Sequence, residues 1–117
     1  MCMEDCLFCK FVKGESQVEI IYENDNFMSF QDISQKVEGH SLVISKKHFE
    51  TVLDMPGSLG SELIDCIKKT SLKLMKEYEA TGFNVVQNNF KDAGQVVNHV
   101  HFHILPRKKG DKVGYVY

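Results

Sequence analysis

The spacing of apolar residues along the chain predicts five strands and one long helix. Short apolar or alternating runs predict strands over residues 18–22, 27–30, 40–45, 83–87 and 98–105. The third run has Leu42, Val43 and Ile44 in succession, so we expect that strand to be buried on both faces. Asn24-Asp25-Asn26 has the composition of a turn between the first two strands.

One longer segment repeats at helical spacing. Its apolar positions are Leu59, Leu63, Ile67, Leu74 and Tyr78. We take Ser58 as its N-cap and Gly82 as its stop, and we expect a single helical turn over residues 49–53 and a compact knuckle over residues 6–12. Strands, then one long helix, then strands indicate an antiparallel α+β fold.

Length and composition favour one small soluble domain. A chain of 117 residues corresponds to one domain, residues 1–117, and its 43% hydrophobic and 26% charged residues are ordinary for a globular protein. A net charge of −2 argues against binding a nucleic acid polymer or an anionic membrane surface. No apolar run approaches the ~20 residues that span a bilayer, and residues 1–5 do not resemble a secretory signal. We therefore expect a cytoplasmic protein.

Cys6-x-x-Cys9 is a candidate metal-binding pair. Its spacing lets two thiolates reach one Zn²⁺, although two buried cysteines without a metal would fit the pair as well. A tetrahedral site needs two more ligands, and composition does not choose among the candidates, which are His40, His48, His99, His101, His103, Cys2 and Cys66.

Three of the five histidines alternate with apolar residues in the last predicted strand. His99, His101 and His103 would share one face of it, and Val100, Phe102 and Ile104 would point into the core. Such a row is suited to three roles. A neutral imidazole can attack phosphorus, a His-x-His strand can hold a catalytic metal, or the histidines can line a polar interface.

The same residues resemble a known family. Residues 99–105, His-Val-His-Phe-His-Ile-Leu, match the His-φ-His-φ-His-φ-φ pattern of the histidine triad (HIT) nucleotide hydrolases and transferases. The segment Cys-Leu-Phe-Cys-Lys near the start resembles the opening of bacterial, HINT-like members with a zinc knuckle. Further likeness lies in residues 30–34, 39–44, 46–48, 84–88 and 93–95. The resemblance spans nearly the whole chain.

The resemblance implies specific catalytic roles. His101 would attack the α-phosphorus of a bound nucleotide, and the carbonyl of His99 would set the tautomer of His101. His103 would contact the phosphate or the bridging atom, and Gln95 and Asn88 would bind phosphate oxygens. A histidine at position 103 is typical of the hydrolases, because the transferases usually have glutamine there.

The resemblance also implies a nucleotide pocket. Asp32 would bind the ribose hydroxyls of a purine nucleotide, and an apolar wall would enclose the base, formed by Phe8, Phe11, Phe30 and Ile33. These four side chains would be equally at home as simple core residues. Val96 departs from the family, which usually has Ser or Thr there, and predicts a slower enzyme or another leaving-group preference.

The resemblance further implies a structural zinc, bound by Cys6, Cys9, His48 and His99, and a homodimer with a continuous ten-stranded sheet. Each subunit would supply a five-stranded antiparallel sheet with one long and one or two short helices. The implied function is hydrolysis of nucleoside phosphoramidates, dinucleoside polyphosphates or related adenylates through a nucleotidyl-histidine. The alternative is a nucleotide-binding regulatory module with little activity, which Val96 would favour.

Overall fold

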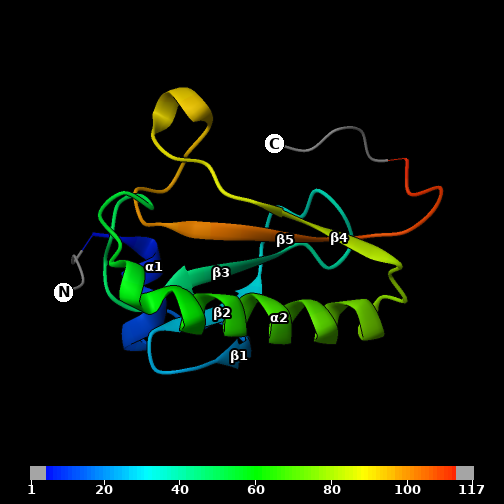
Figure 1. Ribbon diagram of the computed structural model, residues 1–117, viewed down its shortest axis with the longest axis horizontal. Coiled ribbons are helices and arrows are strands. Elements are labelled where there is room, and N and C mark those ends of the chain that lie inside the picture. The colour runs from blue at the N-terminus through cyan, green and yellow to red at the C-terminus, as the bar shows by residue number, and fades with distance from the viewer. Residues whose placement is uncertain (1–4, 113–117) are drawn as a thin grey trace.

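The structure, a computed structural model, describes residues 5–112 and contains one antiparallel sheet of five strands (Figure 1). The strand order is β1-β2-β3-β5-β4, so β1 and β4 are the edges of the sheet. This confirms the predicted sheet. The strands are β1 (Ile20–Glu23), β2 (Phe27–Gln31), β3 (Ser41–Ser45), β4 (Gly82–Val86) and β5 (His101–Arg107).

Helix α2 (Gly60–Glu77) covers one face of the sheet (Figure 1). Its inward residues recur every three or four positions, as expected for an amphipathic helix. They form a core with alternate residues of the strands, and this core contains Phe27, Val43, Leu63, Cys66, Leu74, Val100, Phe102 and Ile104. In residues 5–112 no helix is both long and apolar enough to cross a membrane.

The opposite face carries helix α1 (Leu7–Lys13) and a second core. This core consists of Phe8, Met28, Phe30, Leu42 and Ile44. Strand β3 therefore sends Val43 to the α2 side and its two neighbours to the α1 side, and all five of its residues are buried. The predicted burial of this strand on both faces is confirmed.

Several predicted boundaries are wrong. Residues 49–53 are not helical; a hydrogen-bonded turn begins three residues later, where Met55 N–H donates to Val52 O at 3.4 Å. Before it, the Asp54 carboxylate accepts the backbone N–H groups of Glu50 and Thr51 at 3.0 and 2.9 Å. A 3-10 helix, η1 (Gly57–Leu59), precedes α2, so Ser58 lies inside η1 rather than at a cap. Gly82 opens β4, and Glu79 makes the left-handed reversal after α2 with φ 53°.

The last strand is shorter at its start than predicted. Strand β5 begins at His101, and the two residues before it bond elsewhere: the N–H of His99 donates to Val97 O at 2.8 Å and that of Val100 to Phe49 O at 2.7 Å. His99 thus precedes the ladder in which His101 and His103 lie. This displacement allows its ring to take a different part in the site.

Gly39 allows the loop before β3 to pass close to the end of α2. Its φ is +87°, and a Cβ there would lie 2.6 Å from the ring of Tyr78. Only glycine fits both the left-handed backbone and the close contact. The loop delivers the next residue, His40, to the interior of the protein.

Candidate active site and metal centre

Strand β5 presents His101 and His103 on the α1 side of the sheet. They pair with Ile44 and Leu42 of the α1-side core, whereas Phe102 between them packs beneath α2. A pocket of about 900 Å³ opens over the two histidines. Its other lining residues include Leu7, Phe8, Phe11, Val18, Phe30, Asp32, Ile33, Lys36, Leu42, Val86, Asn88, Gly94, Val96 and Val97.

A carbonyl fixes the tautomer of His101. Its Nδ1 lies 2.7 Å from the backbone O of His99, which can only accept, so Nδ1 carries the proton. Nε2 is then an unprotonated nitrogen with a lone pair. Burial also lowers the pKa of His101 below its usual 6.5, which favours the neutral ring at neutral pH. His101 therefore has the electronic form that a nucleophile requires.

His40, which the sequence interpretation did not assign to the active site, supports His103 from behind. Its Nδ1 accepts the backbone N–H of Lys36 at 3.1 Å, so the His40 proton resides on Nε2. That Nε2 lies 2.9 Å from Nδ1 of His103, which must accept, and 3.6 Å from Asp32 Oδ2. His103 consequently carries its own proton on Nε2. No sequence motif would have shown this, because His40 and His103 meet only in the sheet.

The group Asp32, His40 and His103 has three potential ligand atoms within 4.8 Å of one another. The hydrogen bond from Lys36 argues against a metal there. Because His40 Nδ1 already accepts a hydrogen bond and is unprotonated, metal binding at Nε2 would require a doubly deprotonated ring. This group is better described as a hydrogen-bonded relay than as a metal centre.

A second group has the chemistry of a zinc site. Cys6, Cys9, His48 and His99 place one ligand atom each within 4.8 Å of the others. The Cys6 Sγ–His99 Nδ1, Cys9 Sγ–His48 Nδ1 and Cys9 Sγ–His99 Nδ1 distances are 3.3, 3.4 and 3.6 Å. Tetrahedral Zn²⁺ with its usual bond lengths has S···N edges of about 3.5 Å. The spacing therefore fits a closed Cys₂His₂ site.

The tautomer of His99 also fits a metal ligand. Its Nε2 donates to the carbonyl of Ser45 at 2.7 Å, which leaves the Nδ1 lone pair directed at the two thiols. Of the other candidate ligands, Cys66 is buried on the inward face of α2, and Cys2 lies outside the described residues. The arrangement brings together the four residues that the sequence comparison assigned to zinc.

His99 connects the metal group to the nucleophile. Its ring faces the thiols, and its carbonyl holds His101. Phe8, which lies between the two cysteines in sequence, packs edge-on against both rings, with centroid distances of 5.7 Å to His99 and 5.2 Å to His101. Order in the N-terminal knuckle is thereby coupled to the orientation of the catalytic candidate.

Of the residues predicted to enclose the base, some are buried in the core and one is exposed. Phe8 and Phe30 are 4% and 2% exposed and belong to the α1-side core, and Phe11 packs on both at 6.2 and 5.1 Å between ring centroids. Ile33 is 92% exposed although it lines the pocket, so core packing does not explain it. Asp32 lines the same pocket and accepts the N–H of Ser34 at 3.1 Å with one oxygen.

Gln95 takes a different place from the one expected of a phosphate ligand. It is 4% exposed, and both the oxygen and the nitrogen of its side-chain amide form hydrogen bonds to the backbone. Nε2 donates to Glu50 O at 2.6 Å and Val97 O at 3.1 Å, and Oε1 accepts from Phe90 N–H at 2.6 Å. In this geometry Gln95 holds the loop between β4 and β5. Asn88 lines the pocket as expected.

The half-buried His103 predicts a pH dependence of stability. Burial and the neighbouring histidines lower its pKa from 6.5 to about 4. Between these values the unfolded chain binds more protons, so the free energy of unfolding is highest above pH 6.5 and falls toward pH 4. We expect His103→Gln to reduce that slope by up to about 1.4 kcal/mol per pH unit. Urea unfolding between pH 4.5 and 7.5 measures the free energy of unfolding of both proteins. Equal pH dependence in the wild type and in His103→Gln would refute the lowered pKa of His103.

Comparison with known proteins defines the class to which this fold and site belong. The HIT domain model matches residues 13–110, and the chain belongs to the HIT family. An uncharacterised HIT-like protein of Methanocaldococcus jannaschii is 43% identical over 106 residues, which cover 91% of this chain and 81% of that protein.

Relatives whose names state an activity have similar sequence identity to this chain. The adenosine 5′-monophosphoramidase HNT1 of Candida albicans is 40% identical over 88% of this chain and 70% of its own length. The adenylylsulfatase HINT3 of Arabidopsis thaliana is 37% identical over 92% of this chain and 54% of its own length. The family thus includes proteins named as hydrolases of nucleotide derivatives.

Solved structures show the same fold. A Streptococcus mutans protein, SMU.412c, superposes with a TM-score of 0.91 at 39% identity, over 99% of this chain and 74% of that one. A histidine triad protein of Mycobacterium smegmatis, described as zinc-bound, superposes with a TM-score of 0.88 at 33% identity, over 95% of this chain and 81% of that one. The predicted five-stranded antiparallel HIT-like fold is confirmed.

Proposed function

We propose that this protein hydrolyses nucleotide derivatives at the α-phosphorus, through a covalent intermediate on His101. Its substrates would be nucleoside phosphoramidates, dinucleoside polyphosphates or related adenylates. The observation that carries the proposal is the 2.7 Å hydrogen bond from His101 Nδ1 to the His99 carbonyl, which leaves the Nε2 lone pair available to the pocket. The named activities of the Candida and Arabidopsis relatives support the reaction class.

The reaction would proceed in two displacements. The lone pair of His101 Nε2 forms a bond to phosphorus, and the bond to the leaving group breaks, its electron pair remaining with the leaving atom. A bound phosphate anion raises the pKa of His103 and favours its imidazolium. His103 Nε2–H then protonates the leaving atom and becomes neutral.

Water completes the cycle. It attacks phosphorus, the bond from phosphorus to His101 breaks, and the released proton returns to His103. The 2.9 Å contact with His40 sets the neutral tautomer of His103, to which the ring returns each time it gives up the proton. The products are a nucleoside monophosphate and the protonated leaving group.

The pocket would hold a purine nucleotide in one orientation. The base would lie against Phe8, Phe11 and Phe30 and be covered by the exposed Ile33, because burying an aromatic base there removes apolar surface from water. Asp32 would accept the ribose hydroxyls with its carboxylate, and Asn88 would contact the phosphate. Gln95 would act as a positioning residue for the loop.

Zinc would be structural. Cys6, Cys9, His48 and His99 would complete a four-ligand site and fix α1 to the sheet. Closed tetrahedral zinc contributes folding free energy rather than a reacting group. Thiolate ligation also requires reduced cysteines, which is consistent with work in the cytoplasm.

A homodimer would form along β4. The exposed residues Phe83 and Val85 pair with Pro106 and Ile104 of β5 and therefore face the α2 side of the sheet. They are 42% and 43% exposed at an edge strand, and Ile64 and Leu72 of α2 are also exposed. An apolar edge of this kind is a template for pairing with another strand, here that of a second copy. A continuous ten-stranded sheet would result.

The dimer predicts a simple outcome for one substitution. Val85→Lys should convert the protein from dimer to monomer, because a charge at the edge strand opposes pairing. Analytical ultracentrifugation measures the mass. Ile20→Lys is the matched control, since Ile20 is equally exposed, at 43%, on the other edge strand. A Val85→Lys protein with wild-type mass would exclude β4 as the interface.

The function is tested by release of adenosine monophosphate from adenosine 5′-phosphoramidate and from a diadenosine polyphosphate. Zinc-loaded protein should release it from at least one of them. A protein that binds adenosine monophosphate but turns over neither substrate would instead be the nucleotide-binding regulatory module, which the exposed, hydroxyl-free Val96 favours.

A further inference from the structure

Val96 is an apolar residue that is exposed to solvent at the pocket. It is 90% exposed, yet it lines the cavity over His101 and His103. Its neighbour Val97 is partly buried, as is usual for valine, and packs against the α1-side core. Nothing in the packing of the described residues accounts for the exposure of Val96.

The loop that carries Val96 is rigidly built. Gln95 ties three backbone segments together through Phe90 N–H, Glu50 O and Val97 O. Phe90 has φ 71° and ψ 158°, a strained backbone for a residue with a side chain. Such strain persists only where the surroundings enforce it, so Val96 is fixed at the pocket rather than free to fold away.

Val96 reaches the pocket from the loop between β4 and β5, whereas the apolar base wall comes from α1, β2 and β3. Strands β2 and β3 flank β5 on one side, and they and α1 supply Phe8, Phe11, Phe30 and Leu42. Strand β4, which leads into the loop that carries Val96, lies on the other side of β5. If the base occupies the aromatic wall and the phosphorus lies at His101, the group beyond the phosphorus meets the loop with Val96.

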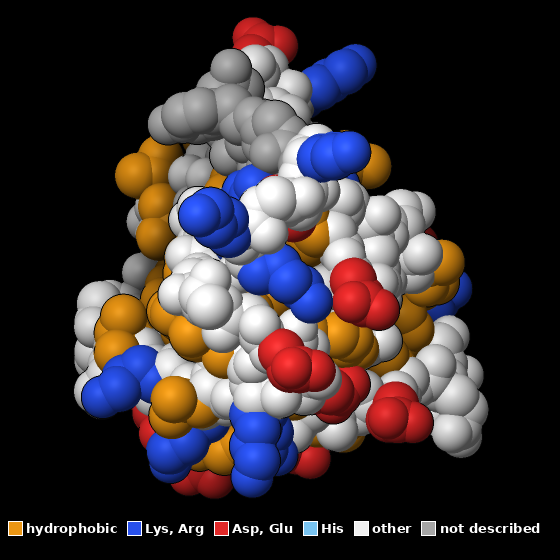
Figure 2. Space-filling model, turned by 90° about the vertical axis from the view of Figure 1, so that its right-hand side faces the viewer, with side chains coloured by type: hydrophobic (Ala, Val, Ile, Leu, Met, Phe, Trp, Pro, Cys, Tyr) orange, Lys and Arg blue, Asp and Glu red, His pale blue; other side chains and the backbone are white. Residues whose placement is uncertain are grey.

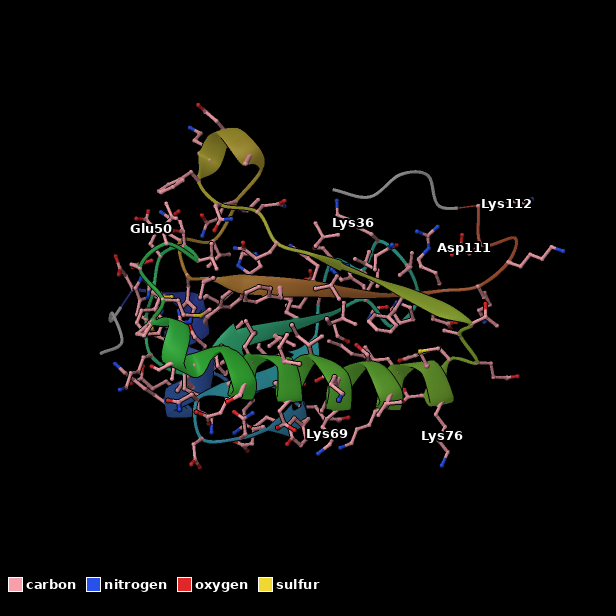
Figure 3. All side chains as sticks on the ribbon, in the orientation of Figure 1. Lys36, Glu50, Lys69, Lys76, Asp111 and Lys112 are labelled. Carbon is pink, nitrogen blue, oxygen red and sulfur yellow. The ribbon has the colours of Figure 1, made fainter. Side chains whose placement is uncertain are left out.

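The part of the pocket near Val96 has no basic side chain among its described lining residues to bind an anion. Lys36 is the only lysine or arginine among the described residues that line the pocket. Figure 3 places Lys36 and Glu50 far apart along the sheet, and Gln95, the residue before Val96, bonds the carbonyl of Glu50 at 2.6 Å. A sulfate or polyphosphate leaving group near Val96 would therefore lose hydration without gaining a cation.

We propose that Val96 makes this site selective for leaving groups that are amines with an apolar substituent. The inference rests on the proposed function and narrows its substrate class to nucleoside phosphoramidates of alkyl or aryl amines. In the step concerned, the P–N bond breaks, its electron pair stays on nitrogen, and His103 Nε2–H supplies the proton that releases the neutral amine. The substituent then covers Val96 and removes both apolar surfaces from water.

Three adenosine substrates test the proposal: the parent phosphoramidate, its N-butyl derivative and adenosine 5′-phosphosulfate. For the wild-type protein we expect kcat/KM for the butyl compound to exceed that for the parent about tenfold, from burial of several methylene groups. Phosphosulfate should be the poorest of the three. Val96→Ser should reduce the butyl preference to about twofold, and Val96→Ala should give an intermediate value.

Val52→Ser is the matched control, because Val52 is 39% exposed and lies outside the pocket lining. It should retain the wild-type preference. Equal kcat/KM for butyl and parent compounds, or a preference unchanged in Val96→Ser, would overturn this inference while leaving the hydrolase intact. Absence of turnover on all three substrates would overturn the proposed function and the inference with it.

Discussion

Replacement of His101 by alanine is expected to lower turnover of a nucleoside phosphoramidate by at least about 10⁴-fold, with little change in binding of adenosine monophosphate. The substitution removes the nitrogen that bonds to phosphorus. It leaves the base wall and His103 in place, because His101 contributes only part of the pocket lining. Steady-state kinetics and calorimetric titration measure the two quantities.

A chemical rescue sharpens this prediction. His101→Gly opens a space where the ring was, and added imidazole should restore part of the turnover if the missing group is a nucleophilic nitrogen. The same substitution at Phe102, the neighbouring core residue, would remove no nucleophilic nitrogen and so would not test this role. Turnover of the alanine variant within tenfold of the wild type would show that another group attacks the phosphorus.

Removal of zinc is expected to cause the largest loss of stability. A ligand that binds only the folded protein contributes about 4 kcal/mol at a free concentration of about 1,000 times its Kd. For a chain of this size that corresponds to a fall in Tm of about 15 °C or more on chelation. Calorimetry with and without a chelator measures the shift, and elemental analysis gives the metal content.

Matched cysteine variants show whether the metal is held where we propose. Cys9→Ser should lose zinc and show the low Tm without a chelator, because Cys9 is fully buried among the ligand atoms. Cys66→Ala should retain zinc, since Cys66 contacts Thr70 on the inward face of α2 and is not part of the zinc group. Zinc in the Cys9→Ser protein at wild-type content would contradict the site.

The order in which stability and activity fall distinguishes structural from catalytic zinc. A structural metal acts on the reaction through His99, whose carbonyl holds His101, and through Phe8, which packs on both rings. At low temperature, where the folded state persists, chelated protein should keep measurable turnover. A metalloenzyme would lose its chemistry as soon as the metal is removed.

The surface agrees with a small-molecule substrate. Lysine and acidic side chains are interspersed, with hydrophobic groups between them, on the face shown in Figure 2. A protein that binds a nucleic acid polymer usually presents one continuous basic face, and this face does not. The pocket over β5, rather than an extended surface, is where we propose that a nucleotide binds.

Much of the fold could be predicted because it depends on local patterns. The apolar triplet in β3, the helical repeat of α2 and the alternation in residues 100–105 each require a particular burial, which the structure confirms. One predicted boundary failed because a long-range hydrogen bond decides it. The N–H of Val100 bonds Phe49 and so delays the start of β5.

The sequence by itself determined the class of protein, because motif and periodicity are encoded by neighbouring residues, and the family resemblance predicted the carbonyl contact that fixes the tautomer of His101. Only the tertiary structure decided which atoms face one another. It paired His40 with His103, gathered Cys6, Cys9, His48 and His99, used both ends of the Gln95 amide, and left Ile33 and Val96 exposed. These contacts join segments up to 93 residues apart, and their direction depends on how the strands align in the sheet.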